Sequence, residues 1–145
     1  MSDLSTATVT IEAPAEQVQA VLFDLPSYPS WSTSIKSVNV ISSDDKGRAT
    51  QVQVSVDAGA LKDKPTLNYD WSKAPARLEF SLEDADLLTE MTGAYIIKDN
   101  GDETTDVTYE LTVALSMPVP AMMRKKAEQS TIDLALKQLK EKLEN

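Results

Sequence analysis

The 145-residue chain contains no cysteine and no histidine. Without cysteine no disulfide can form, and zinc sites built from Cys and His ligands are excluded. Catalytic triads and histidine general bases are excluded for the same reason. Any chemistry would have to use carboxylates, Lys, Arg, Tyr, hydroxyl groups or a borrowed cofactor. We expect no metal site and no cofactor.

Basic residues are also scarce, because 14 Lys and Arg stand against 23 Asp and Glu, for a formal charge of −9. A negative field repels phosphate backbones and anionic membrane surfaces, so we expect no nucleic-acid partner. The sequence has no signal-peptide pattern at its start and no run of the ~20 apolar residues that a membrane span needs. We therefore expect a cytoplasmic protein without stable membrane insertion, either a monomer or a weak dimer.

Apolar residues make up 41% and charged residues 26% of the chain, which is typical of a soluble globular protein. A chain of this length fits one domain and can bury a full core. We find no internal repeat, no low-complexity segment and no composition shift. The sequence therefore predicts a single domain over residues 1–145.

Alternating apolar and polar residues predict most of the secondary structure. Helix formers follow Pro14 up to Phe23, and two prolines restrict 25–31 to a short helical turn or a tight connector. Residues 121–143 contain no Gly or Pro and predict one long helix. Residues 59–65 are expected to form a polar loop. The predicted strands cover 6–12, 38–41, 50–56, 67–71, 78–83, 91–97 and 106–117.

This order of elements indicates an α+β fold. Short turns between neighbouring strands imply an antiparallel meander, and each strand has only one apolar face. The long C-terminal helix is the only element large enough to cover that face. We therefore expect a curved antiparallel sheet of about seven strands wrapped around this helix, with two short helices after the first strand.

Several segments are similar to the helix-grip superfamily of START-like and birch-pollen-allergen-like domains, also called SRPBCC. The matching segments are Ile11–Val18, Asp24–Trp31, Gly93–Tyr95, Thr105–Glu110 and Lys137–Lys140. Within the superfamily the chain most resembles the bacterial polyketide cyclase/dehydrase and coenzyme Q-binding branch. The resemblance implies an elongated apolar cavity between sheet and helix. Members bind lipids, polyketides, quinones, sterols or plant hormones there, and some close or dehydrate aromatic rings.

Tyrosine, tryptophan and methionine dominate the large residues on the face predicted to meet the helix. Such side chains suit a pocket for a flat, apolar ligand that carries a few oxygens, although an ordinary solid core would look similar. The candidate ligand-binding residues are Trp31, Tyr69, Trp71, Met91, Gly93, Tyr95, Tyr109, Met117, Met123 and Ala127.

Three local features have two interpretations each. Gly93 lies in the middle of a strand, where it either lets a ligand or the helix approach or marks a bulge. Tyr28 and Trp31 either gate one end of the cavity or plug it. The polar residues 129–131 interrupt the apolar stripe of the long helix and face either the cavity or solvent. Residues 117–123 are expected to form the rim of the cavity.

Charged residues discriminate between binding and catalysis. Strand parity places Asp70, Glu79 and Glu110 on the outer face of the sheet, which leaves the tyrosine hydroxyls and either Arg124 or Gln129 as inward polar candidates. The basic run that begins at Arg124 is either a solvated surface or a contact for an acidic head group. We name no catalytic residue, and an inward acid or base deep in the cavity would favour catalysis.

These observations give three functional hypotheses. In the first, the chain binds or transports a hydrophobic small molecule, such as a lipid, a quinone or a polyketide-like compound, in an internal cavity. In the second, the same cavity belongs to a polyketide cyclase, aromatase or dehydrase. In the third, the chain is a protein-interaction module, as in relatives that act on chaperones or ribosomes.

Overall fold

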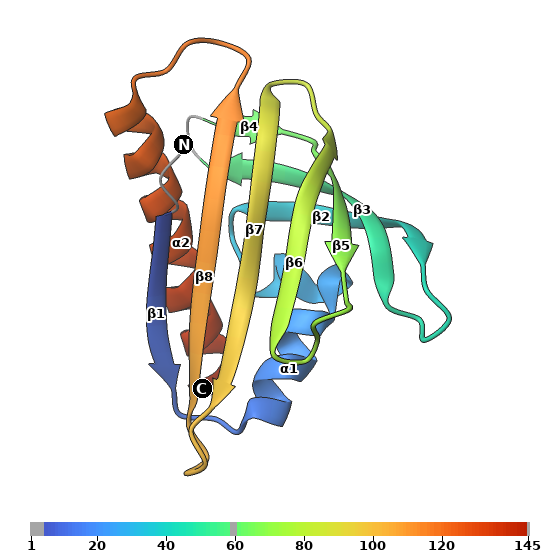
Figure 1. Cartoon of the computed structure of the whole chain (residues 1–145), viewed down its shortest axis with the longest axis vertical. Helices are drawn as coiled ribbons and strands as arrows, with labels where there is room; N and C mark the ends of the chain where they lie inside the picture. The colour runs from blue at the N-terminus through green and yellow to red at the C-terminus, as the bar shows by residue number, and fades with distance from the viewer. Residues whose placement is uncertain (1–4, 59–60, 145) are drawn as a thin grey trace.

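The protein is described by a computed structural model that covers residues 5–58 and 61–144 (Figure 1). A strand, an α-helix and a 3-10 helix come first, then seven strands and a long helix. The elements are β1 (Ser5–Ile11), α1 (Ala15–Phe23), η1 (Leu25–Ser30), β2 (Ile35–Ser43), β3 (Ala49–Ala58), β4 (Leu61–Asp63), β5 (Thr66–Asp70), β6 (Arg77–Asp84), β7 (Leu88–Asp99), β8 (Thr105–Leu115) and α2 (Ala121–Glu144).

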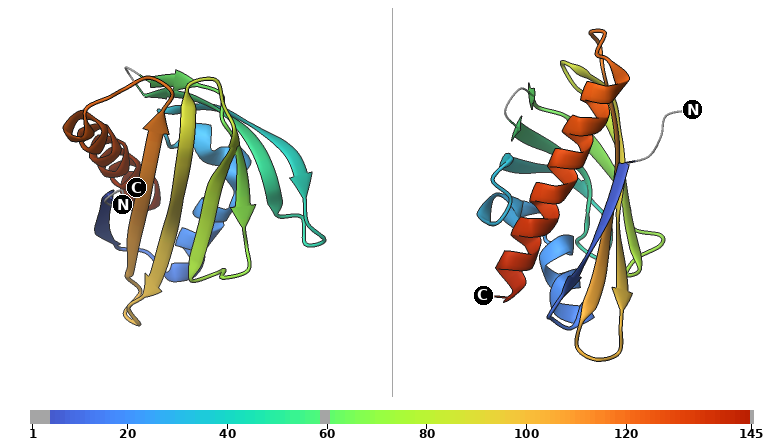
Figure 2. Two further views of the ribbon diagram at one scale, coloured as in Figure 1. Left: turned by 45° about the horizontal axis from the view of Figure 1, so that its top comes forward. Right: turned by 90° about the vertical axis from the view of Figure 1, so that its left-hand side faces the viewer.

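All strands belong to one antiparallel sheet in the order β1-β8-β7-β6-β5-β3-β2, with β4 paired to β3. The sheet curves so that α2, α1 and η1 all lie on its concave side (Figure 2). This arrangement confirms the predicted α+β helix-grip fold, including the two short helices after the first strand. The strand beyond the predicted seven is β4, which lies within the segment 59–65 that was predicted as a loop. Residues 59–60 of that segment lie outside the described residues.

The end of the last strand differs from the sequence prediction for a physical reason. The last strand ends at Leu115 instead of Met117, because Pro118 has no N–H to continue a ladder. The Ser116 N–H donates to the carbonyl of Leu87 at 2.9 Å, just before β7 begins at Leu88. The chain therefore leaves the sheet two residues earlier than predicted, and α2 begins at Ala121.

The hydrophobic core is tightly packed at the end of the molecule formed by α1 and the second half of α2. Leu22 of α1 and Leu136 and Leu139 of α2 are almost completely inaccessible to solvent. The Tyr28 hydroxyl ties η1 to this end by donating to the Leu22 carbonyl at 2.6 Å. The polar outer face of α2 meets solvent. Within residues 5–58 and 61–144, no helix is long and apolar enough to cross a membrane.

Gly93 makes room for an aromatic ring of the neighbouring strand. It pairs with Phe80 of β6 and Leu111 of β8, and the register through this point is continuous, without a bulge. A Cβ atom on Gly93 would lie 2.5 Å from the Phe80 ring and 2.7 Å from the Glu110 carbonyl oxygen. The Phe80 ring therefore covers the backbone of Gly93, and this strand position accepts no side chain without a local shift.

We expect Gly93→Ala to lower the free energy of unfolding by about 2 kcal/mol, the usual scale for overpacking a close contact. Urea unfolding followed by circular dichroism measures the change. Phe80→Leu in the same background should restore part of the loss, because it removes the ring that the new methyl group meets. A Gly93→Ala variant as stable as the parent would contradict the close packing of Phe80 over β7.

Candidate functional site

A cavity of about 630 Å³ lies between the first half of α2 and the concave face of the sheet. Its volume falls within the usual ~300–1,000 Å³ of small-molecule sites. The wall consists mostly of aliphatic and aromatic side chains. Its residues belong to η1, to every strand from β2 to β8 except β4, and to the connecting segments at 32–34, 87, 117 and 119. From α2 the lining residues are Met123, Arg124, Ala127, Glu128, Ser130, Thr131, Leu134 and Ala135.

The cavity exists because small side chains face each other across it. On α2 the facing positions are Ala127, Ser130 and Thr131, which project too little volume to reach the sheet. On β3 the opposite wall is made of short branched residues, Val52 and Val54 among them. Ile132, the residue after Thr131, is completely buried, whereas Leu134 and Ala135 still line the cavity. The cavity therefore depends on the small side chains at these positions of α2.

A tyrosine cluster forms the aromatic part of the cavity wall. The rings of Tyr95 and Tyr109 stack with centroids 4.3 Å apart, and Phe80 lies 5.5 Å from Tyr69 and 6.5 Å from Tyr109. Burial raises the pKa of Tyr69 and Tyr109, and burial together with its tyrosine neighbours raises that of Tyr95. These phenols therefore stay protonated at physiological pH. Tyr95 and Tyr109 hydrogen-bond each other, and the remaining O–H donors can serve a ligand oxygen.

An ion pair of α2 supplies the charged part of the wall. Glu128 is 1% exposed and both of its carboxylate oxygens are bonded: Oε1 accepts from the Ser5 hydroxyl and Oε2 from the Val113 N–H, each at 2.7 Å. Arg124, one turn earlier, places Nη1 3.6 Å from Glu128 Oε2 and 3.3 Å from the Val113 carbonyl. Within residues 5–58 and 61–144, these two are the charged residues that line the cavity.

The ion pair bonds both backbone groups of Val113 on β8. The described pairing of β1 with β8 begins at Ser5 and Leu111, so the next outward-facing backbone groups of β8 belong to Val113. Glu128 accepts the N–H of Val113, and Arg124 donates to its carbonyl. A buried backbone group without a partner costs free energy, and here two side chains of α2 satisfy both groups.

A buried carboxylate also holds the loop between β6 and β7, which contributes Leu87 and Leu88 to the cavity wall. Asp63, at the end of β4, accepts the backbone N–H groups of Asp86, Leu87 and Leu88 at 2.9–3.0 Å, and that of Lys64 at 2.8 Å. Burial alone would raise the pKa of Asp63, but these four donors outweigh it and the pKa lies below its usual value.

Most of the candidate residues line the cavity. They are Tyr69, Met91, Tyr95, Tyr109, Met117, Met123 and Ala127. Of the rim residues, Met117 is 53% and Met123 62% exposed, so the cavity opens beside them. Ser130 and Thr131 face the cavity, whereas Gln129 points away and donates to Asp133 at 3.0 Å.

Trp31, Trp71 and Gly93 lie outside the cavity lining. Trp71 packs edge-to-face on Phe23 with ring centroids 5.2 Å apart, and its Nε1 donates to the Ala49 carbonyl at 2.7 Å. Trp31 is buried beside Tyr28, and its Nε1 has no partner among the described residues. Tyr28 itself lines the cavity, so this connector closes one side of it.

Glu128, which lines the cavity, and Asp63, which holds part of its wall in place, are the residues that sequence reasoning missed. Extending the buried stripe of α2 back from Leu136 and Ile132 by one further turn leads to Glu128, but a search for apolar residues passes over a glutamate. Asp63 has no such signal, because its four donors come from its own turn and from a loop more than twenty residues away.

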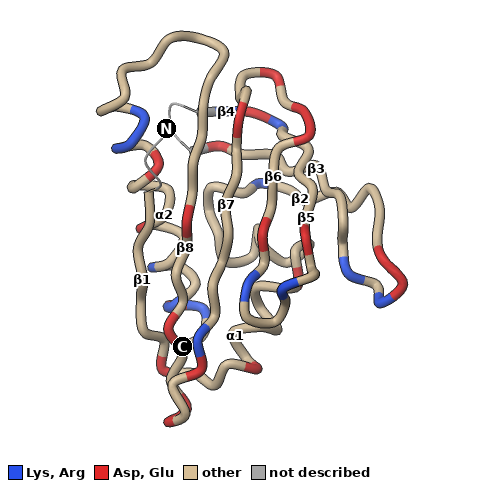
Figure 3. The backbone as a smooth tube through the Cα atoms, viewed as in Figure 1, with Lys and Arg blue, Asp and Glu red and all other residues tan. Residues whose placement is uncertain are grey.

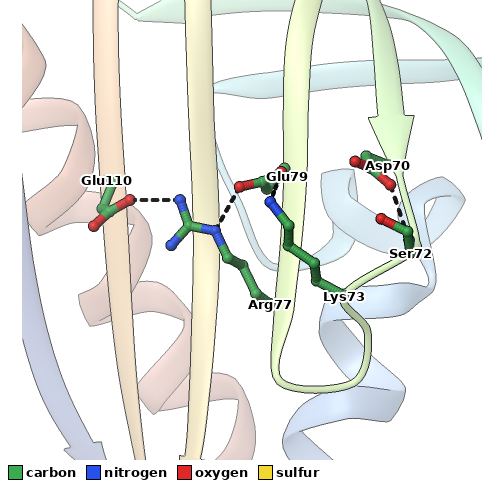
Figure 4. Close-up of polar contacts among 6 residues, drawn as sticks. All are labelled: Asp70, Ser72, Lys73, Arg77, Glu79 and Glu110. Atoms are coloured by element: carbon green, nitrogen blue, oxygen red, sulfur yellow. Dashed lines mark hydrogen bonds and ion pairs between the residues drawn. The ribbon is translucent and has the colours of Figure 1, made fainter.

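The outer face of the sheet carries a separate polar network and a more open hollow of about 440 Å³. Arg77 of β6 reaches across β7 to Glu110 of β8 at 3.0 Å and also pairs with Glu79 at 2.6 Å, while Lys73 adds a second cation to Glu79 at 3.0 Å (Figure 4). The hydrogen bond from Arg77 lowers the pKa of Glu79. Because these charges are already paired with one another, we assign no ligand site here.

A curved antiparallel sheet that encloses a mostly apolar cavity against a long C-terminal helix defines the class of helix-grip domains. A family model described as polyketide cyclase/dehydrase and lipid transport matches residues 4–144, and the chain belongs to that family. A search of curated proteins finds no match.

Solved structures show the same fold. A START superfamily protein from Mycobacterium smegmatis is 24% identical, with a TM-score of 0.92 and 97% of each chain covered. A protein from Thermus thermophilus is 22% identical, with a TM-score of 0.81 and 97% of each chain covered. The Zhui aromatase/cyclase of a Streptomyces species is 16% identical, with a TM-score of 0.79 and 98% of this chain and 93% of that chain covered.

We expect Glu128→Ala to reduce the free energy of unfolding by about 3 kcal/mol, because it leaves Arg124 without its counter-ion and the Val113 N–H without an acceptor. Urea unfolding again provides the measurement. Glu141→Ala, an exposed substitution on the same helix, should change stability by less than about 0.5 kcal/mol. Equal stability of the two variants would contradict the role assigned to Glu128.

Asp63 should make stability depend on pH in a defined direction. Its folded pKa is depressed, so its contribution is complete above the unfolded value of about 3.9 and is lost as pH falls through the folded pKa. Asp63→Asn should cost about 2 kcal/mol at neutral pH, and the difference from the parent should shrink on acidification. Urea unfolding over a pH series tests this, with Asp45→Asn in an exposed turn as the control. A difference independent of pH would contradict the prediction.

Proposed function

We propose that this chain binds a hydrophobic small molecule in the cavity between α2 and the sheet. The observation that carries the proposal is the cavity itself: about 630 Å³, walled mainly by aliphatic and aromatic side chains and open beside Met117 and Met123. Burial of apolar ligand surface supplies the main driving force, at about 25 cal/mol per Å² before association costs.

The polar groups in the wall indicate what else the ligand carries. Tyr69, Tyr95 and Tyr109 are protonated phenols grouped on neighbouring strands, and they suit one or two ligand oxygens. A quinone, a polyketide-like aromatic compound or an oxygenated lipid has this combination of an apolar body and a few oxygens. Family membership supports the same choice, because the family description includes both cyclases and lipid transport.

We favour binding over catalysis because of the state of the titratable groups. A cyclase or dehydrase needs a base that gives and takes a proton at the substrate. The raised pKa values of the wall tyrosines make them poor bases. Glu128, the carboxylate in the described wall, already uses both oxygens on Ser5 and Val113. The cavity volume of about 630 Å³ likewise favours a small ligand over a role as a protein-interaction module alone.

Fluorescence titration with Nile red tests the proposal, because this neutral dye brightens when it enters an apolar site. We expect saturable binding at one site and displacement of the dye by decylubiquinone or dodecanol. A protein that leaves the dye dark and yields no apolar compound on solvent extraction would overturn the proposal.

Ala127→Phe should weaken dye binding by about ten-fold, because the new ring projects from α2 into the opening of the cavity. Ala121→Phe makes the same substitution on the same helix at an exposed position that does not line the cavity. Dye affinity should remain unchanged in that control. Equal affinities of the two variants would place the dye somewhere other than the cavity.

A further inference from the structure

Arg124 differs from its partner Glu128 in how fully its hydrogen-bonding groups are used. Both oxygens of Glu128 hold bonds of 2.7 Å. The two contacts of Arg124 among described residues are longer, 3.3 and 3.6 Å, and both involve Nη1. Nε and Nη2 thus have no partner in the described part of the chain. A guanidinium has five N–H donors in a planar fork that matches a carboxylate or a phosphate.

Arg124 lies at the open part of the cavity, beside the exposed Met123. Its side chain is only 20% exposed and belongs to the cavity wall. Its neighbours there include Met123, and Met117 comes from the loop before the helix. A ligand whose apolar body lies against the tyrosines and valines could therefore place its head group at Arg124 without leaving the cavity.

Local charge also favours an anion at this point, although the chain as a whole carries −9. Arg124, Lys125 and Lys126 are consecutive, and Glu128 is the single acidic residue between positions 111 and 132. The first turns of α2 accordingly form a basic region of the surface (Figure 3). The first turn has no acidic residue, so nothing in it offsets the positive end of the helix dipole.

We propose that Arg124 is the head-group site of the cavity and binds the oxyanion of an amphipathic ligand, a carboxylate or a phosphate, whose apolar part fills the interior. This inference rests on the proposed function, because it assumes that the cavity takes a ligand. It narrows the ligand class from hydrophobic compounds in general to amphipathic anions.

Calorimetric titration of the full chain with four ligands that share one alkyl chain tests the proposal: dodecanoate, dodecyl phosphate, dodecanol and methyl dodecanoate. We expect at least one of the two anions to bind about ten-fold or more tightly than the alcohol and the ester, the usual effect of a hydrogen bond to a charged group. The stronger of the two anions identifies the head group as carboxylate or phosphate. This comparison needs no variant.

Arg124→Gln should reduce the ratio of the affinity for the preferred anion to the affinity for dodecanol by about ten-fold. Lys126→Gln removes a charge from the same turn without changing the cavity wall, and it should preserve the preference for the anion. Should Arg124→Gln fail to fold, Arg124→Lys keeps the charge but loses the planar fork, and it should lower the preference.

The outcomes separate the two proposals. Tight binding of all four ligands with equal affinity overturns the assignment of Arg124 and leaves the proposed function standing. A preference for anions that survives Arg124→Gln but disappears in Lys126→Gln also overturns the assignment, since it would place the head group on the outer surface. Failure of all four ligands to bind while Nile red still binds overturns the assignment of Arg124 alone, and failure of the dye as well overturns both proposals.

Discussion

The attachment of the first half of α2 to the sheet depends on one buried carboxylate. Along the second half of the helix, Ile132, Leu136 and Leu139 fill the space to the sheet, and apolar packing holds the helix there. Along the first half that packing is missing, because Ala127 and Ser130 face a hollow. Glu128 attaches this half of the helix to the sheet, because its two oxygens accept hydrogen bonds from Ser5 and Val113 on neighbouring strands.

This arrangement explains how the fold tolerates a cavity of this size. A void in a core removes contacts from its lining and costs stability in proportion to its size. The solid end, formed by α1 and the second half of α2, compensates by burying many side chains completely. At the hollow end, directed polar bonds from Glu128 and Asp63 hold the helix and the loop between β6 and β7 in place of close packing. The cavity wall is thereby kept open by hydrogen bonds that a ligand does not need to break.

The sequence was sufficient for the fold because the fold depends on patterns that repeat. Alternation along each strand and the long segment from Ala121 without Gly or Pro predicted the sheet, its apolar face and the helix that covers it. Boundaries were less accurate, as at Met117, since two prolines and a contact with Leu87 decide where β8 ends. The short strand β4 lacked any pattern, because three residues are too few to show a period.

The site was harder to predict because it depends on single contacts between distant residues. Strand parity placed Tyr69, Tyr95 and Tyr109 on the concave face, where the structure finds them at the cavity. Strand parity could not predict that Trp71 packs on Phe23 of α1 instead of lining the cavity, because residues on the concave face contact either the packed core or the cavity. The role of Glu128 follows from where β1 pairs with β8, which no local pattern reveals.

The residues that stabilise the fold and the residues that line the cavity lie at opposite ends of the molecule. The packed residues of the solid end, such as Leu22 and Leu136, make the contacts that keep sheet and helices together. Residues at the open end, such as Ala127 and Ser130, border empty space, so a change there alters the shape of the cavity with little effect on the core. A TM-score of 0.92 at 24% identity therefore shows a shared fold, and it does not identify the ligand. Under the proposed function, ligand choice depends both on the strand tyrosines and on the first three turns of α2, where Arg124 and its small neighbours line the cavity.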